Sequence, residues 1–160
     1  MNLLFTALEK HAALLTKPVH LCPTMIQTHV LEKLLNHLLS SVIDEGELDF
    51  LEDQWIELKL LDCDLSYFLG YNSQAQRCLV QDKGAADASI SCKLTDAILL
   101  ITQQVDPDTL FFQRRLLLEG NTALSHGFKN ILDTVELDQL GFPLSHGIQL
   151  LSRAFPQPQT

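Results

Sequence analysis

The chain has 160 residues, of which 46% are apolar and 19% are charged, and 11 basic and 20 acidic side chains give it a formal net charge of −9. This composition is typical of one globular domain and excludes a disordered chain, a collagen and a disulfide scaffold. The acidic balance argues against a nucleic-acid partner, because phosphate neutralisation needs clustered Lys and Arg, and only Arg114 and Arg115 are adjacent. Residues 44–64 carry nine acidic side chains and one basic one, which indicates a solvated acidic face.

Cysteine usage and hydropathy predict a cytoplasmic protein. The four cysteines are scattered without a C-x-x-C pair, which favours small buried side chains in a reducing compartment. The N-terminus has no basic stretch before its apolar residues, so no signal peptide is expected. No apolar run approaches the length of a membrane span, so at most peripheral membrane contact is expected.

The first 43 residues have helical periodicity. An apolar stripe predicts a helix over residues 3–16, which Pro18 would end. A wider stripe predicts a second helix from Met25 to Ile43, buried on more than one side. Gly46 follows and suits a left-handed cap.

The period then changes from 3.6 to 2, which predicts strands. The clearest alternation runs from Ala86 to Leu94, with Ser89 and Ser91 expected on a wet face and Ile90 on a covered one. The five predicted strands in this part of the chain are 47–51, 55–61, 65–71, 77–81 and 86–94.

In the second half of the chain, segments with the helical period of 3.6 alternate with a segment that has the strand period of 2. Thr95 is the expected N-cap of the first of these helices, and Asn121 that of a later one. The predicted elements are helix 96–104, a helical turn at 109–113, strand 115–119, helix 121–135 and helix 143–155. This order predicts an α+β fold with a mostly antiparallel five-stranded sheet packed against helices and preceded by N-terminal helices.

No catalytic or metal-binding pattern is present. The chain lacks the nucleophile-elbow, zincin, P-loop and dinucleotide motifs, so no enzyme activity and no cofactor are expected. The pairs Asp62/Asp64 and Asp106/Asp108 are interpreted as turn residues, since aspartate bonds its own backbone in turns. His29 and His37 are eight residues apart, too far to chelate one ion easily.

Apolar side chains are dense in the second half of the chain. Core packing explains most of them, but a helix after the hinge Gly141–Pro143 could close or line an apolar cavity suited to lipids. Arg114 and Arg115 follow two phenylalanines, an arrangement that allows a nucleotide or head-group site. Two adjacent basic residues alone are weak evidence for such a site. The favoured interpretation is that they lie at the start of a strand and offset nearby acidic residues.

Several segments resemble the sterol carrier protein type 2 lipid-binding family. The stretch from Asp106 to Leu124 (DPDTLFFQRRLLLEGNTAL) carries most of the resemblance, and KNILD at 129–133 adds to it. DEGELDFLE at 44–52 with Trp55, and ADASIS at 86–91, are similar to the branch whose members are accessory factors of oxygen-independent ubiquinone biosynthesis. The resemblance covers about His20 to Leu140. Asn121 stands where the pattern usually has aspartate, and either residue can cap a helix.

The resemblance implies a sheet and helices around a hydrophobic tunnel that binds isoprenoid or other lipids without catalytic residues. It also implies partners: a prenylated quinone precursor, peptidase-U32-type iron–sulfur hydroxylation proteins and other ubiquinone biosynthesis proteins. The predicted segments are an N-terminal helical part (1–43), a lipid-binding domain (44–140) and a C-terminal amphipathic helix and tail (141–160), forming one structural unit.

Apolar density and the resemblance together predict which side chains contact lipid. The function expected is to hold or present an apolar quinone precursor. The alternatives are an assembly module without bound lipid and a small lipid-modifying enzyme. The candidate lipid-binding residues are Ile98, Ile101, Phe111, Phe112, Leu116, Leu118, Phe128, Ile131, Leu132, Val135, Leu144 and Ile148.

Overall fold

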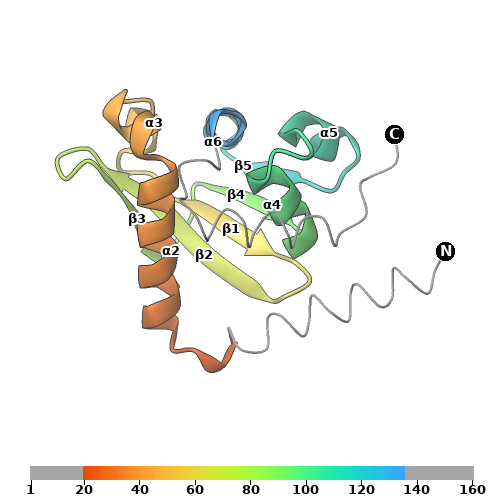
Figure 1. Ribbon diagram of the computed structural model, residues 1–160, viewed down its shortest axis with the longest axis horizontal. Coiled ribbons are helices and arrows are strands. Elements are labelled where there is room, and N and C mark those ends of the chain that lie inside the picture. The colour runs from red at the N-terminus through yellow and green to blue at the C-terminus, as the bar shows by residue number, and fades with distance from the viewer. Residues whose placement is uncertain (1–19, 136–160) are drawn as a thin grey trace.

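The computed structural model describes residues 20–135 of the chain (Figure 1). The helices predicted for 3–16 and 143–155, the latter with Leu144 and Ile148, lie outside the described residues, and the predicted segment boundaries at 43 and 140 stay predictions. The described helices are α2 (Thr24–Leu38), α3 (Ser40–Asp44), the single 3₁₀ turn η1 (Asp49–Leu51), α4 (Leu94–Ile101), α5 (Pro107–Phe112) and α6 (Thr122–Thr134). No helix within 20–135 has the length and apolar character to cross a bilayer.

Five strands form one sheet in the order β3-β2-β1-β4-β5. The strands are β1 (Ile56–Leu60), β2 (Leu65–Asn72), β3 (Arg77–Gln81), β4 (Ala88–Cys92) and β5 (Leu117–Gly120). The α+β class with a five-stranded sheet is confirmed. The prediction of a mostly antiparallel sheet is wrong: β1 and β4, at the centre, are parallel, so the sheet is mixed.

The connection between β3 and β4 explains the parallel pair. Residues 82–87 carry the chain from the β3 edge past β2 and β1, and Gly84 packs against the ring of Phe68 on the way. Asp87 then fastens the connection to the start of β1: its N–H donates to the Trp55 carbonyl at 2.9 Å, and its carboxylate accepts from the Trp55 N–H at 2.9 Å. β4 therefore starts beside the first residue of β1 and runs in the same direction.

The core lies on one face of the sheet, where alternate strand residues point toward α6. The register places Ile56, Leu69 and Ala88 on this face, and all three are buried. α6 packs on β4 and β5 and contributes Phe128 and Ile131 to the same cluster. Burying side chains of this size provides most of the free energy that favours folding.

Helix α2 runs alongside the edge strand β3 (Figure 1). An edge strand exposes unpaired backbone groups, and α2 supplies partners for them. The Asn36 side chain accepts from the Cys78 N–H at 2.7 Å and donates to the Cys78 carbonyl at 3.0 Å. Glu32 accepts from the Val80 N–H at 3.1 Å. This edge of the sheet is therefore closed by side chains rather than by a sixth strand.

Several local predictions are wrong. Residues 47–51 form turns and η1 instead of a strand, because Leu48 and Leu51 are both buried at a spacing of three. The helix predicted from Met25 to Ile43 is interrupted at Leu39.

The start of α4 and one face of β4 also differ from prediction. The N-cap of α4 is Lys93 rather than Thr95, and the Leu94 N–H donates to the carboxylate of Asp62 at 2.8 Å. Ser91 is buried, because this small side chain lies between its longer register partners Lys59 and Leu117.

Candidate functional site

An open groove of about 440 Å³ lies where α5 meets β5. Four of the candidate lipid-binding residues line it. Phe112 is 80% exposed, and Phe111 and Leu117 are exposed beside it. Large apolar side chains gathered at a surface mark an interaction or ligand site more often than they arise by chance. The full lining is Phe111, Phe112, Arg114, Leu116, Leu117, Leu118 and Glu119.

The sequence of α5 explains why its phenylalanines face outward. Asp106 caps the helix: its carboxylate accepts from the Thr109 N–H at 2.8 Å, and Pro107 occupies the first turn, where its missing N–H costs nothing. Pro107 and Leu110 are buried and anchor the inner side of α5. Phe111 and Phe112 follow Leu110 and turn away from that anchor, with their rings edge to face at 5.8 Å between centroids.

Strand β5 forms the other wall. Its register with β4 pairs Leu118 with Ile90 on the core face, so Leu117 lies on the opposite face. Gly120 ends the strand with φ +79°, and a Cβ there would approach the Asp87 carbonyl oxygen to 2.6 Å. Only glycine fits this position, which sets where β5 ends and α6 begins.

Two ion pairs hold the helices around the groove in place. Arg115 pairs with the buried carboxylate of Asp96 on α4, and the buried Lys129 of α6 pairs with Asp108 on α5. The ring of His126 on α6 lies against Phe111 at 6.1 Å between centroids. Asp106 thus bonds the local backbone, in agreement with the turn interpretation, whereas Asp108 is an ion-pair partner of α6.

The remaining candidate residues within 20–135 do not line the groove, and all of them except Ile98 belong to the hydrophobic core or pack against it. Phe128, Ile131 and Val135 are buried, and Ile98, Ile101 and Leu132 are half-buried. Their contact with a lipid stays a prediction. The structure adds Leu117, Arg114 and Glu119, which the prediction omitted. Leu117 sits in the apolar run 116–118, and only the strand register tells which of the three faces outward.

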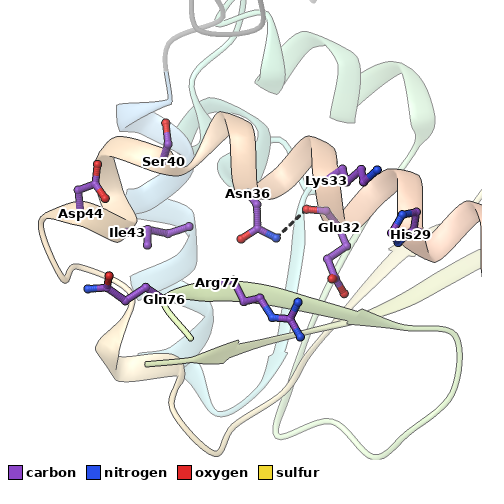
Figure 2. A pocket seen from close by; sticks show the side chains of 9 residues that line it. All are labelled: His29, Glu32, Lys33, Asn36, Ser40, Ile43, Asp44, Gln76 and Arg77. Atoms are coloured by element: carbon purple, nitrogen blue, oxygen red, sulfur yellow. Dashed lines mark hydrogen bonds between the residues drawn. The ribbon is translucent and has the colours of Figure 1, made fainter. Parts of the chain in front are cut away.

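A second groove of about 460 Å³ lies between α2 and the start of β3 (Figure 2). His29, Glu32, Lys33 and Arg77 bring both signs of charge to it. Figure 2 shows Asn36 and Glu32 extending from α2 toward β3, where they bond the edge of the sheet. We therefore interpret this groove as part of the α2–β3 junction.

Two of the cysteines are buried thiols with strongly raised pKa values. Burial raises the pKa of both Cys78 and Cys92 to about 12, so neither supplies a thiolate nucleophile near neutral pH. No group of three or more His, Cys, Asp or Glu side chains within residues 20–135 is arranged to hold a metal ion.

Comparisons with known proteins identify the family of the chain. Residues 31–133 match the SCP-2 sterol transfer family. The ubiquinone biosynthesis accessory factor UbiT of Escherichia coli strain K12 is 38% identical over 128 residues, which cover 80% of this chain and 72% of that protein, and the UbiT of strain O157:H7 gives the same values.

A solved structure shares the fold. The UbiJ-SCP2 ubiquinone synthesis protein superposes with a TM-score of 0.59 at 19% identity, over 71% of this chain and 98% of that one. The resemblance found in the sequence is confirmed by these matches. We conclude that the chain belongs to the SCP-2 sterol transfer family.

Proposed function

We propose that this protein is an accessory factor of ubiquinone biosynthesis that binds an apolar quinone precursor in the groove between α5 and β5. The similarity to UbiT supports the pathway. The family supports a lipid as the ligand. In this proposal the ligand is prenylated, the pathway is the oxygen-independent one, and the protein works in the cytoplasm.

The observation that carries the proposal is the exposed apolar lining of this groove. Phe111, Phe112 and Leu117 leave large apolar surfaces in contact with water, although Pro107 and Leu110 of α5 are buried. Each methylene of a prenyl chain buried there contributes about 0.8 kcal/mol, so an apolar wall alone provides affinity. Binding of this kind needs no activated nucleophile.

The charged groups near the groove support a binding role over a catalytic one. Asp96, Asp106 and Asp108 are each engaged in an ion pair or a helix cap. We propose that the precursor is presented to other proteins of the pathway, including iron–sulfur hydroxylation proteins of the peptidase-U32 type. The acidic segment 44–64 is the surface we propose for such contacts.

Native mass spectrometry of the purified protein, with extraction of the bound lipid, tests the proposal. We expect a prenylated or acylated molecule to accompany the wild-type protein. Phe112→Ser should retain much less of it, because the largest exposed apolar wall is lost. Leu61→Ser is the matched control, since Leu61 is an exposed apolar side chain outside the groove. Its lipid content should equal that of the wild type.

Three outcomes would overturn the proposal. A wild-type protein that carries no lipid, and takes up none when offered prenylated benzoate, would indicate an assembly module. Equal retention by Phe112→Ser and Leu61→Ser would place the ligand elsewhere. Chemical conversion of the added lipid by the isolated protein would indicate an enzyme.

A further inference from the structure

The turn that follows α5 holds an arginine in a backbone conformation that favours glycine. Arg114 has φ +58°. Its N–H donates to the Phe111 carbonyl at 3.0 Å, and the next N–H, of Arg115, donates to the Leu110 carbonyl at 2.9 Å. These two bonds define a Schellman turn, in which Arg114 occupies the left-handed position where glycine or asparagine is usual. A side chain with a Cβ is unfavourable there.

The local structure gives no reason for arginine at this position. The ion pair that fastens the turn to α4 is made by the neighbouring Arg115 with Asp96. Within residues 20–135, Arg114 has no ion-pair partner. Basic side chains are also scarce in this chain, at 11 against 20 acidic ones. Five non-glycine residues in the described part of the chain have positive φ, and Arg114 is the one among them that lines the apolar groove.

The side chain of Arg114 lines the apolar groove. It shares that lining with Phe112 and Leu117, which are apolar, and with Glu119. Arg114 is exposed, so its guanidinium is accessible to an anion at the edge of the apolar walls. A ligand chain that covers those walls would exclude water and strengthen the pairing, because the local dielectric falls. Its planar fork also matches the two oxygens of a carboxylate or phosphate.

We infer that the groove selects amphiphiles with an anionic head group, and that Arg114 is the residue that recognises this head group. The inference rests on the proposed function and names the class of ligand: an apolar chain ending in a carboxylate or a phosphate. The chain lies along Phe112 and Leu117. The head group lies at Arg114. The basic pair at 114–115, interpreted from sequence as a strand entry, thus has two separate roles.

Binding of a matched pair of probes tests the inference. Dodecanoate and its methyl ester have the same chain, and only the first is an anion. We expect the wild-type protein to bind dodecanoate about two- to fivefold more tightly than the ester, which lies within the range expected for one exposed ion pair. Arg114→Gly should bind both probes equally, and Arg114→Lys should keep part of the preference.

The stability of the variants adds a second readout. Arg114→Gly removes an unfavourable left-handed residue, so its melting temperature should be equal to or higher than that of the wild type. Gln76→Gly is the matched control, because Gln76 has φ +48°, is exposed and lies on the second groove (Figure 2). It should gain stability in the same way and leave the preference for dodecanoate unchanged.

The outcomes separate this inference from the proposed function. If the methyl ester fails to bind the wild-type protein, the apolar groove itself is refuted. If the ester binds and dodecanoate has no advantage, or if Arg114→Gly keeps the advantage, the role of Arg114 is overturned. Inorganic phosphate tests whether the site needs the apolar chain. If phosphate displaces dodecanoate at low millimolar concentration, the site binds anions without a chain and the inference is overturned.

Discussion

Phe112 and Phe128 belong to the same predicted set of lipid-binding residues but have opposite surroundings. Phe128, on the inner side of α6, is 2% exposed, whereas Phe112, at the groove, is 80% exposed. Both lie in apolar stretches of the sequence, and hydropathy alone does not distinguish them. The difference arises because Leu110 anchors α5 and leaves Phe112 on its outer side, whereas Phe128 lies on the inner stripe of α6.

These two residues give a prediction about stability. Phe128→Ala should lower the free energy of unfolding by about 3–5 kcal/mol, because it leaves a cavity in the core. Phe112→Ala should change it by less than about 0.5 kcal/mol, because the ring contacts mainly solvent. Urea denaturation followed by circular dichroism measures both. Similar losses in the two variants would show that Phe112 is part of the core.

Asp106 gives a prediction about pH. The Thr109 hydroxyl and backbone N–H donate to its carboxylate and hold its pKa below the ordinary value of 3.8. A carboxyl whose pKa is lowered by folding stabilises the protein above the unfolded pKa, and this contribution is lost as the pH falls through the folded pKa. Asp106→Asn keeps a good cap that does not titrate. The stability of the wild type relative to this variant should therefore decrease below about pH 4.

Carbon-detected NMR titration of the Asp106 carboxyl group checks the cause directly. The midpoint should lie below the ordinary aspartate value of 3.8. Thr109→Val, which removes the hydroxyl donor, should move the midpoint of Asp106 upward. A midpoint in the ordinary range in the wild-type protein would contradict the hydrogen bonds described for this cap.

At the scale of elements, the junction of α2 with β3 shows how a helix can terminate a sheet. The Asn36 amide accepts from the Cys78 N–H and donates to the Cys78 carbonyl, as a neighbouring strand would. Charged or covered edges prevent sheets from pairing with other chains. Asn36 appears in the sequence as a polar residue within an apolar stripe, and nothing local indicates that its partner is 42 residues away.

Removing this amide should open the edge. Asn36→Ala leaves the N–H and carbonyl of the buried Cys78 without their partner, which we expect to cost about 1–3 kcal/mol of unfolding free energy. Lys33→Ala, an exposed position in the same groove, is the control and should stay within about 0.5 kcal/mol of the wild type. Hydrogen exchange locates the effect: the Cys78 amide should exchange faster in Asn36→Ala, and unchanged exchange there would refute this role.

At the scale of the whole molecule, the parallel pairing of β1 and β4 places β5 opposite β3 at the other end of the strand order. Among the strands of residues 20–135, β5 pairs with β4 alone, and the groove lies where α5 meets β5. The two edges of the sheet therefore differ: α2 closes the β3 edge with hydrogen bonds, and the β5 edge presents apolar side chains.

A test in cells addresses the function as a whole. In cells that lack the native gene and grow without oxygen, Phe112→Asp should abolish ubiquinone production, because a charge in the groove disfavours an apolar chain. His29→Ala and His37→Ala should leave quinone content near the wild-type level, since both side chains lie on α2, away from the groove. Protein levels are measured in parallel. Loss of quinone in a folded histidine variant would favour an enzyme over a carrier.

Periodicity and capping residues determined most of the elements. The alternation at 55–61, 65–71 and 77–81 predicted β1, β2 and β3 within two residues, and Asn121 caps α6 as expected. The segment from Asp106 to Leu124, together with the shorter similar segments, indicated the family that the comparison shows. These signals are readable because strand period, helix period and caps depend on residues close together in the chain.

Only the tertiary structure decided the mixed sheet, the face on which each apolar residue lies, and the site. The β3–β4 connection has ordinary turn residues, and its path past two strands depends on contacts with Trp55 and Phe68 that lie far away in sequence. In the sequence, nothing distinguishes Arg114 from its neighbour Arg115. In the structure, Arg114 occupies the left-handed turn after α5, whereas Arg115 pairs with Asp96 on α4. This turn and the register of β5 with β4 depend on how distant segments pack, so the sequence alone does not show them.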